Sequence, residues 1–240
     1  MLAIETENLT KRYKGKTAVN GINLKINQGE LFALLGTNGA GKTTTIKMLS
    51  TLILPTDGKI TINGLDIVKD RQKIKEILNV SPQETAIAPN LSVKENLEFM
   101  AGVYQISNKK EKINELIKLF NLNEVLNQKA KTLSGGWQRK VSIAISLINE
   151  PKILFLDEPT LGLDVIARKE LWAVINDLKG RITITLTTHY MEEAESLSDR
   201  IGIMAKGNLI SVGTSEELIR QACAENFEDA FVKISTGGAL

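Results

Sequence analysis

The sequence predicts an α/β fold, with a mostly parallel sheet, an antiparallel β portion near the N-terminus and an inserted all-helical subdomain. Residues 31–35 and 153–156 are apolar runs without polar alternation, which is typical of parallel strands covered on both faces. Residues 3–9 and 22–26 alternate instead, as half-buried strands do. From about residue 84 to residue 150, apolar side chains recur at helical spacing and the strand pattern disappears.

The other elements follow from local patterns. Residues 44–52 have helical character directly after a Gly-rich turn, whereas residues 59–63 and 77–81 have the composition of short strands. Pro151 closes the helical region. Beyond the strand at 153–156, we expect a helix with an apolar face, another strand and a hairpin: residues 171–178, residues 182–186, and residues 201–212 around Lys206-Gly207.

The length of the chain bounds its organisation. At about 150 residues per domain, 240 residues give between one and two domains. We expect a single domain over residues 1–240. Its sheet-containing core would comprise residues 1–83 and 151–215, interrupted by the helical subdomain at 84–150 and followed by a C-terminal tail at 216–240.

Composition excludes several classes of protein. Hydrophobic residues make up 42% of the chain and charged residues 24%, so a disordered or fibrous protein is excluded. A formal net charge of +2 gives no electrostatic case for binding nucleic acid, and the single cysteine excludes an internal disulfide and a multi-cysteine metal site. Because neither a signal peptide nor a run of about 20 apolar residues is found, we expect a soluble cytosolic protein.

A phosphate-binding loop follows the first apolar strand. The pattern G-x-x-x-x-G-K-[ST] is met by Gly36, Thr37, Asn38, Gly39, Ala40, Gly41, Lys42 and Thr43, with Thr44 next in the predicted helix. Glycines let backbone N–H groups turn toward a polyphosphate, and the helix N-terminus adds partial positive charge. Lys42 would reach the β- and γ-phosphates, and the Thr43 hydroxyl would take one Mg²⁺ position. The alternative is a Gly-rich structural turn, but the flanking strand and helix favour a nucleotide site.

Two acidic residues end the second apolar strand. Asp157 and Glu158 would lie at the C-terminal edge of the sheet, beside the phosphate loop. Asp157 would hold Mg²⁺ through water, and Glu158 would act on the attacking water as general base. The alternative is a pair of surface acids that cap the following helix. Together with the phosphate loop, the two acids favour hydrolysis of a nucleoside triphosphate.

A third motif distinguishes among phosphate-loop enzymes, which include kinases, GTPases and motor ATPases. The guanine-binding pattern Asn-Lys-x-Asp is approached only by residues 108–111, which end in Glu and lie in the helical region. Residues 133–140, Leu-Ser-Gly-Gly-Trp-Gln-Arg-Lys, resemble the signature of ATP-binding cassette (ABC) ATPases. The hydroxyl of Ser134 and the backbone amides of Gly135 and Gly136 would form a second phosphate cradle at a helix N-terminus. An ordinary Ser-capped helix is the alternative, which the order of the three motifs disfavours.

The resemblance covers nearly the whole chain and implies further site residues. Tyr13 matches the aromatic residue that stacks on adenine, Gln83 the glutamine that contacts Mg²⁺ or water, and His189 the histidine that contacts the γ-phosphate. A surface tyrosine, a loop amide and a structural histidine are the respective alternatives. By this resemblance the catalytic residues are Lys42, Gln83, Glu158 and His189, and the magnesium ligands are Thr43, Gln83 and Asp157.

The resemblance also implies cofactors and partners. ATP and Mg²⁺ would bind, and two copies would face head to tail, with Ser134 and Gly136 of one copy contacting the nucleotide of the other. The chain departs from the family at Trp137, which stands where Gln or Met is usual, and at Leu161 and Val165 in the loop that crosses the dimer. Trp137 bears on turnover and dimer affinity, and the loop residues bear on dimer details.

The C-terminal part indicates a branch of the family. Residues 188–195 and 226–231 resemble ATPase subunits of drug, antibiotic or sodium exporters, although a packed C-terminal helix would also explain the latter. The sequence therefore predicts an ATPase that powers export through separate membrane permease subunits, is bound at the inner face of the cell membrane and has no nucleic-acid partner. The alternatives are a non-transport ABC ATPase acting on nucleic acid or ribosomes, and a small-molecule kinase.

Overall fold

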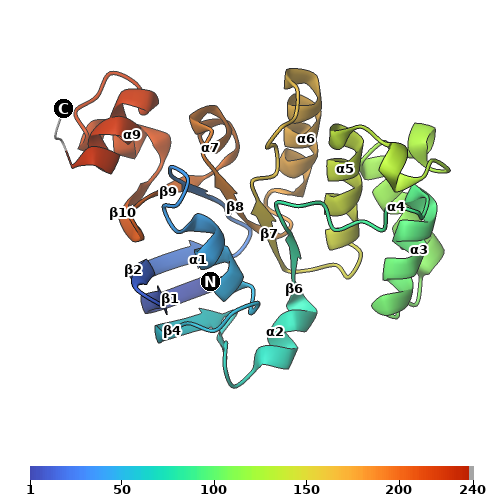
Figure 1. Ribbon diagram of the computed structural model, residues 1–240, viewed down its shortest axis with the longest axis horizontal. Coiled ribbons are helices and arrows are strands. Elements are labelled where there is room, and N and C mark those ends of the chain that lie inside the picture. The colour runs from blue at the N-terminus through green and yellow to red at the C-terminus, as the bar shows by residue number, and fades with distance from the viewer. Residues whose placement is uncertain (238–240) are drawn as a thin grey trace.

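A six-stranded sheet forms the centre of the computed structural model, which describes residues 1–237 (Figure 1). The strand order is β10-β9-β3-β8-β7-β6; β10 pairs antiparallel with β9, and the other pairings are parallel. The predicted mostly parallel core is therefore confirmed. The strands are β3 Leu31–Leu35, β6 Leu78–Ser81, β7 Ile153–Asp157, β8 Thr183–Thr188, β9 Arg200–Ala205 and β10 Asn208–Gly213.

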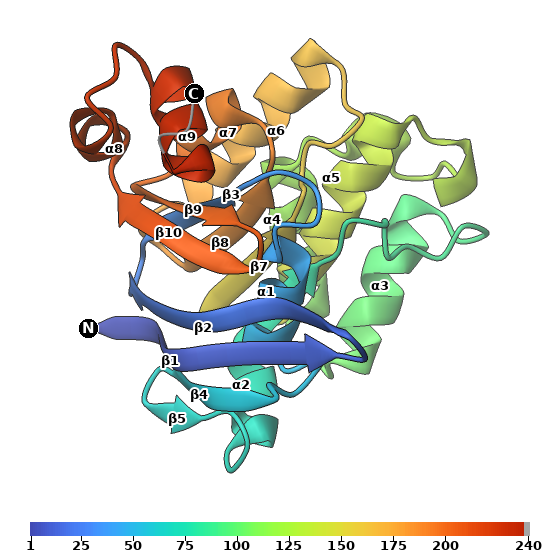
Figure 2. The same cartoon turned by 60° about the vertical axis from the view of Figure 1, so that its left-hand side comes forward.

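An antiparallel sheet lies beside the central sheet and contains the N-terminus (Figure 2). Its order is β2-β1-β4-β5, with bounds β1 Leu2–Tyr13, β2 Lys16–Asn27, β4 Asp57–Ile62 and β5 Leu65–Asp66. In β2, Ile22, Leu24 and Ile26 are buried whereas Asn23 and Lys25 are exposed. The predicted alternation is thus the alternation between a packed face and a solvated face.

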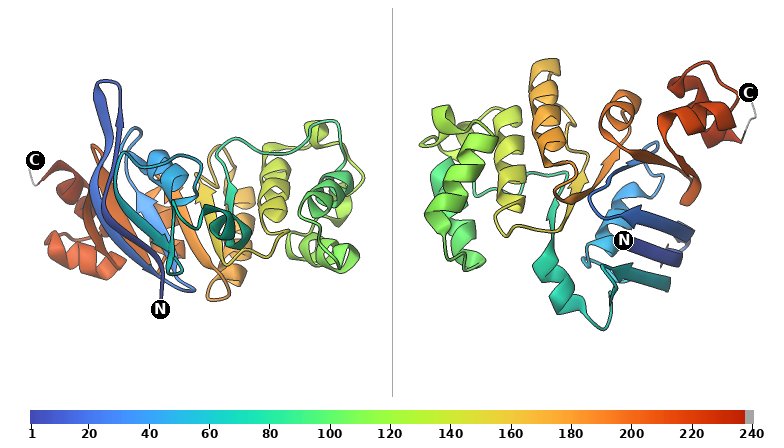
Figure 3. Two further views of the ribbon diagram at one scale, coloured as in Figure 1. Left: turned by 90° about the horizontal axis from the view of Figure 1, so that it is seen from below. Right: turned by 180° about the vertical axis from the view of Figure 1, so that it is seen from behind.

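Nine α-helices accompany the sheets within residues 1–237: α1 Lys42–Leu49, α2 Arg71–Ile77, α3 Val93–Val103, α4 Lys109–Leu119, α5 Gly135–Ser146, α6 Val165–Leu178, α7 Met191–Leu197, α8 Ser215–Gln221 and α9 Phe227–Thr236. Short 3₁₀ turns occupy Asn123–Val125 and Ala130–Thr132. Helices α3, α4 and α5 gather at the end of the molecule away from the antiparallel sheet (Figure 3). Within residues 1–237, no helix is both long enough and apolar enough to cross a membrane.

Strand β3 explains why an apolar run without alternation is needed at the centre. Leu31, Ala33 and Leu35 belong to the hydrophobic core that also contains residues of α3–α7, whereas Phe32 and Leu34 belong to the core shared with α1 and the antiparallel sheet. Each face of the strand is therefore covered by a different layer, and all five side chains are buried.

Several boundaries differ from the prediction. Helix α1 begins at Lys42, before the predicted residues 44–52, because Gly41 precedes it at φ 105°, a conformation that glycine adopts readily. Helix α2 was not predicted because Ile74 is its one buried residue, so that it shows no apolar face. Its continuation through Ile77 delays the strand predicted at 77–81 until Leu78.

Of two hairpins in the structure, one is longer than the predicted strand segments and the other agrees with the prediction. Strands β1 and β2 pair up to Tyr13 and Lys16, well beyond the alternating segments, and so form a long hairpin. The predicted turn at Lys206 and Gly207 is found between β9 and β10, with φ 49° and 84°. Two successive positive φ values are typical of the tight turns that match the twist of a hairpin.

Candidate functional site

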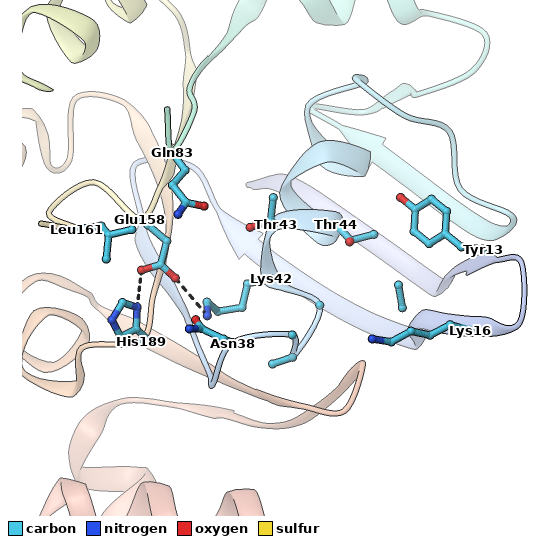
Figure 4. Close-up of a pocket in the computed structure, with 14 residues that line it drawn as sticks. Tyr13, Lys16, Asn38, Lys42, Thr43, Thr44, Gln83, Glu158, Leu161 and His189 are labelled. Carbon is cyan, nitrogen blue, oxygen red and sulfur yellow. Dashed lines mark hydrogen bonds and ion pairs between the residues drawn. The ribbon is translucent and has the colours of Figure 1, made fainter. Parts of the chain in front are cut away.

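A cavity of about 590 Å³ opens at the C-terminal ends of the parallel strands (Figure 4). The segments that follow β3, β6, β7 and β8 all contribute residues to this cavity. Ligands bind at this edge in open parallel sheets. The lining residues are Tyr13, Lys16, Ala18, Asn38, Gly39, Ala40, Gly41, Lys42, Thr43, Thr44, Gln83, Glu158, Leu161 and His189.

The glycines of the phosphate loop have two different roles. A Cβ atom on Gly36 would lie 2.4 Å from the Met204 carbonyl oxygen, and one on Gly41 would lie 2.5 Å from the Ala18 carbonyl oxygen. Any larger residue would therefore push the loop away from its neighbours. Gly39 has φ 80° and nothing within 4 Å of its Cβ position, so it supplies the turn and leaves the loop open toward the cavity.

Lys42, Glu158 and His189 meet inside the cavity (Figure 4). The two carboxylate oxygens of Glu158 lie 3.2 Å from Lys42 Nζ and 2.8 Å from His189 Nδ1. Lys42 also donates to the carbonyl oxygens of Gly36 and Thr37, at 2.7 and 3.4 Å. These two predicted loop residues do not line the cavity. An ammonium, a carboxylate and an imidazole are thus within reach of one reacting group.

The backbone of Glu158 has an unusual conformation. Its φ is 49°, in the left-handed region that residues other than glycine seldom adopt. The Glu158 N–H group donates to the carbonyl oxygen and to Oγ1 of Thr187 on neighbouring β8, at 3.1 and 3.0 Å. With the amide held in this way, the side chain turns toward Lys42 and His189 instead of continuing along β7.

Asp157 lies beneath the phosphate loop, outside the cavity lining. Its Oδ1 accepts from Thr43 Oγ1 at 3.1 Å and from Thr187 Oγ1 at 2.5 Å. A hydroxyl and a carboxylate oxygen side by side are the hard donors that Mg²⁺ prefers, so this pair fits the ion. Residues 1–237 hold no cluster of three His, Cys, Asp or Glu side chains suited to a metal, so a site at this pair would draw its further ligands from other oxygen donors, such as an amide side chain, phosphate or water.

Tyr13 and Gln83 lie on other parts of the cavity wall. Tyr13, at the end of β1, is 50% exposed and lies on the opposite side of the cavity from Glu158 and His189 (Figure 4). Gln83 is exposed in the segment after β6, near Glu158 and Thr43 (Figure 4). The structure therefore brings both predicted residues to the cavity, with the aromatic ring far from the acid.

The signature residues are outside this cavity. Ser134 caps α5, where its Oγ accepts from the Trp137 N–H group at 3.5 Å; Ser134 and Gly135 are exposed and Gly136 is half-buried. None of the three lines the cavity that contains the phosphate loop. Trp137 packs partly against the hydrophobic core, with Lys140 Nζ 4.5 Å from its ring centroid. One chain thus keeps its two predicted phosphate cradles apart.

Three buried residues of the site were missed by the sequence reasoning. Thr187 contacts Asp157 and Glu158, Arg139 contacts backbone around both acids, and Glu193 accepts from Thr160 Oγ1 at 2.8 Å just beyond them. Burial raises the pKa of Glu193 above its ordinary value, against the effect of its hydrogen bonds. Each of the three lies next to a predicted motif, but nothing in the spacing shows that its side chain turns inward.

Comparison with known proteins agrees with the geometry. The sequence pattern described as "ABC transporter" matches residues 19–161. The chain is 38% identical over 240 residues to the probable multidrug ABC transporter ATP-binding protein YbhF of Escherichia coli, covering 96% of this chain and 41% of that protein. It is 37% identical over 238 residues to the linearmycin resistance ATP-binding protein LnrL of Bacillus subtilis, covering 98% and 75%. The chain thus spans about two fifths of the first relative's length.

Two solved structures share the fold over most of their length. The structure of an ATP-binding subunit of an ABC transporter superposes with a TM-score of 0.86 at 28% identity, over 97% of this chain and 99% of that one. The dimeric ATP-binding cassette MJ0796, bound to ADP and Pi in a post-hydrolysis state, superposes with a TM-score of 0.80 at 27% identity, over 88% and 98%. The chain therefore belongs to the ABC transporter family and shares the fold of solved ATP-binding cassettes.

Proposed function

We propose that this chain powers the export of a substrate through separate membrane permease subunits by hydrolysing ATP. The observation that carries the hydrolytic part is the position of Glu158 between Lys42 and His189 inside the cavity. Export is supported by the relatives, which include a probable multidrug transporter protein and a linearmycin resistance protein. The transported compound is left open, because its binding surface would lie in the permease.

In the proposed reaction, each cavity residue has a distinct task. The N–H groups of the phosphate loop and the Lys42 ammonium hold the β- and γ-phosphates, and the ring of Tyr13 stacks on adenine. Glu158 takes the proton of the water that attacks the γ-phosphate, because its carboxylate is the acid exposed to the cavity. His189 contacts the γ-phosphate and orients Glu158 through their 2.8 Å contact. Gln83, which lies near Glu158, orients water (Figure 4).

A magnesium ion would be held by Thr43, Asp157 and Gln83. When bound, it would neutralise part of the charge on the phosphate oxygens. Asp157 suits this task because the Thr187 hydroxyl fixes its Oδ1 next to Thr43. Gln83 is exposed after β6, so it can reach an ion at the mouth of the cavity.

A second copy would complete the site. Ser134, Gly135 and Gly136 lie outside the cavity of their own chain, at the capped N-terminus of α5, where backbone N–H groups and the helix dipole favour an anion. In a head-to-tail dimer they would contact the γ-phosphate held by the partner's loop. The dimeric MJ0796 cassette supports this arrangement.

Binding and hydrolysis of ATP would then close and open the dimer and move the permease. For this motion the chain would act as three parts: the core at 1–83 and 151–215, the helical subdomain at 84–150, and the tail at 216–240. Residues 238–240 of the tail lie outside the described residues. The helical subdomain would transmit the motion to permease subunits from the cytoplasmic side of the membrane.

Co-expression with a candidate permease, a membrane protein with about six hydrophobic spans, would test the transport function. We expect the two proteins to purify together and the ATPase rate to rise when the complex is placed in lipid vesicles, with an Asp157→Asn complex as the inactive control. If nucleic acid raised the ATPase rate and the membrane protein had no effect on it, the result would contradict export and favour the non-transport alternative.

A further inference from the structure

Arg139 is a buried cation in the second turn of the signature helix. It is 4% exposed, and within residues 1–237 no carboxylate group lies close enough to form an ion pair with it. Its guanidinium donates instead to backbone carbonyl oxygens on two different strand ends. Burial lowers the pKa of Arg139 and nearby acids oppose the effect, but an arginine starts so high that the group stays charged.

The five carbonyl groups belong to the two segments that carry two of the predicted catalytic residues, Glu158 and Gln83. After β7, Arg139 Nε donates to Pro159 at 2.7 Å, and Nη2 donates to Asp157 and Glu158 at 2.8 and 2.5 Å. After β6, Nη1 donates to Pro82 and Gln83 at 2.6 and 3.2 Å. One planar group thus joins both ends, which a lysine ammonium with its three donors and different shape could not do.

These contacts act on the strained residue of the site. Glu158 has φ 49°, a conformation that persists only where the surrounding structure enforces it. Its N–H group is held by Thr187 and its carbonyl oxygen by Arg139, so the two peptide groups on either side of its Cα are fixed from opposite directions. The orientation of the Glu158 side chain toward Lys42 and His189 follows from that backbone.

We propose that Arg139 is a positioning residue for ATP hydrolysis: it holds the Glu158 backbone in its strained conformation and ties it to the Gln83 segment. Since Arg139 is on α5, three residues after Gly136, it also makes the placement of the general base depend on the helix that bears the signature. This inference rests on the role given to Glu158 under the proposed function.

Arg139→Lys keeps the positive charge but removes the planar guanidinium with its several donors, whereas Arg139→Met removes both the charge and the donors. We expect kcat to fall about 10-fold in Arg139→Lys and further in Arg139→Met, whereas KM for ATP changes by less than about twofold, since the Lys42 loop is untouched. Lys112→Met is the matched control. Lys112 on α4 is similarly buried, at 8% exposure, but its partners are Glu115 and Glu150, so kcat should be retained.

A double-variant cycle separates positioning from a general structural effect. If Arg139 acts through Glu158, then Arg139→Lys should lower kcat much less in a Glu158→Gln background than in the wild-type chain. A full, additive loss in that background would overturn the inference while leaving the role of Glu158 intact. Near-normal hydrolysis by Glu158→Gln alone would instead remove the general base itself, and both proposals with it. Equal loss of nucleotide binding and kcat in Arg139→Lys would also contradict a positioning role.

Discussion

The two phosphate-binding regions of this chain differ in how they are held. Lys42 and Glu158 lie in a cavity and are 5% and 6% exposed, and Glu158 contacts both Lys42 and His189. Ser134, by contrast, is exposed, and among residues 1–237 its hydroxyl has one hydrogen bond, from the Trp137 N–H group of its own helix. The first region is organised before any second molecule arrives, whereas the second presents donors to something outside the chain.

This difference indicates where each region obtains its precision. The catalytic region is fixed by contacts between residues on different elements, such as Thr187 of β8 with Asp157 of β7, and Arg139 of α5 with Glu158. The signature region is fixed by one helix cap, which orients N–H groups but encloses nothing. Changes in the first region should therefore affect turnover within one chain, and changes in the second should affect association of two.

The largest effect is expected from Glu158→Gln, which removes the general base and keeps the shape of the side chain. ATP hydrolysis should slow by at least about 100-fold, because general bases contribute 10² or more to the rate. ATP binding, measured by fluorescence titration, should persist because Lys42 and the loop are unchanged. Hydrolysis close to that of the wild-type protein would show that the buried region is not where catalysis is organised.

A smaller effect on the same region is expected from Thr187→Val. The change removes the hydroxyl that contacts Asp157 and Glu158, and the free energy of unfolding should fall by about 1–3 kcal/mol. Turnover should fall with it. Thr185→Val is the matched control on the same strand: Thr185 is fully buried and its Oγ1 has no hydrogen-bond partner in the described chain, so its loss should cost little. Equal destabilisation in urea titrations would argue against the specific role of Thr187.

Tyr13 lies at the open side of the cavity and should matter for affinity alone. Loss of one stacked base corresponds to about 1 kcal/mol at the low end, so Tyr13→Ala should raise KM for ATP about 5-fold. Its kcat should stay unchanged because the ring is far from Glu158. Tyr13→Trp should retain wild-type KM. A fall in kcat at saturating ATP would mean that Tyr13 affects turnover as well as affinity, and would contradict the separation of the two sides of the cavity.

The smallest effect concerns Glu193, on the helix that follows His189. Burial raises its pKa above the ordinary value of 4.5. Between pH 4.5 and the raised value, the folded chain therefore keeps a proton that the unfolded chain has released. Its contribution to stability is therefore complete below pH 4.5 and is lost as pH rises through the raised value. The stability advantage of wild type over Glu193→Gln should shrink over that range in urea titrations, with exposed Glu195→Gln as control. An unchanging difference would show that the pKa of Glu193 is the same in the folded and the unfolded chain.

Sequence reasoning found the residues whose position follows from a strand end. Asp157 ends the apolar strand β7 and Glu158 follows it, and Lys42 follows the apolar strand β3 across the phosphate loop; parallel strands bring such residues to one edge. Arg139 and Thr187 could not be found in this way. Their roles depend on contacts with residues about 20 to 60 positions away, which helical or strand periodicity does not encode. The same limit hid α2, whose charged residues give no apolar stripe.

The central claim, that the exposed signature completes the site of a second copy, is tested most directly by dimerisation. The Glu158→Gln protein, which should retain ATP, is compared by light scattering with the same protein carrying Ser134→Arg. We expect ATP to drive the first to a dimer and to leave the second a monomer. Ser92→Arg, which removes the N-terminal cap of α3 instead, controls for the loss of a helix cap and should still dimerise. Equal dimerisation with and without Ser134→Arg would contradict the claim.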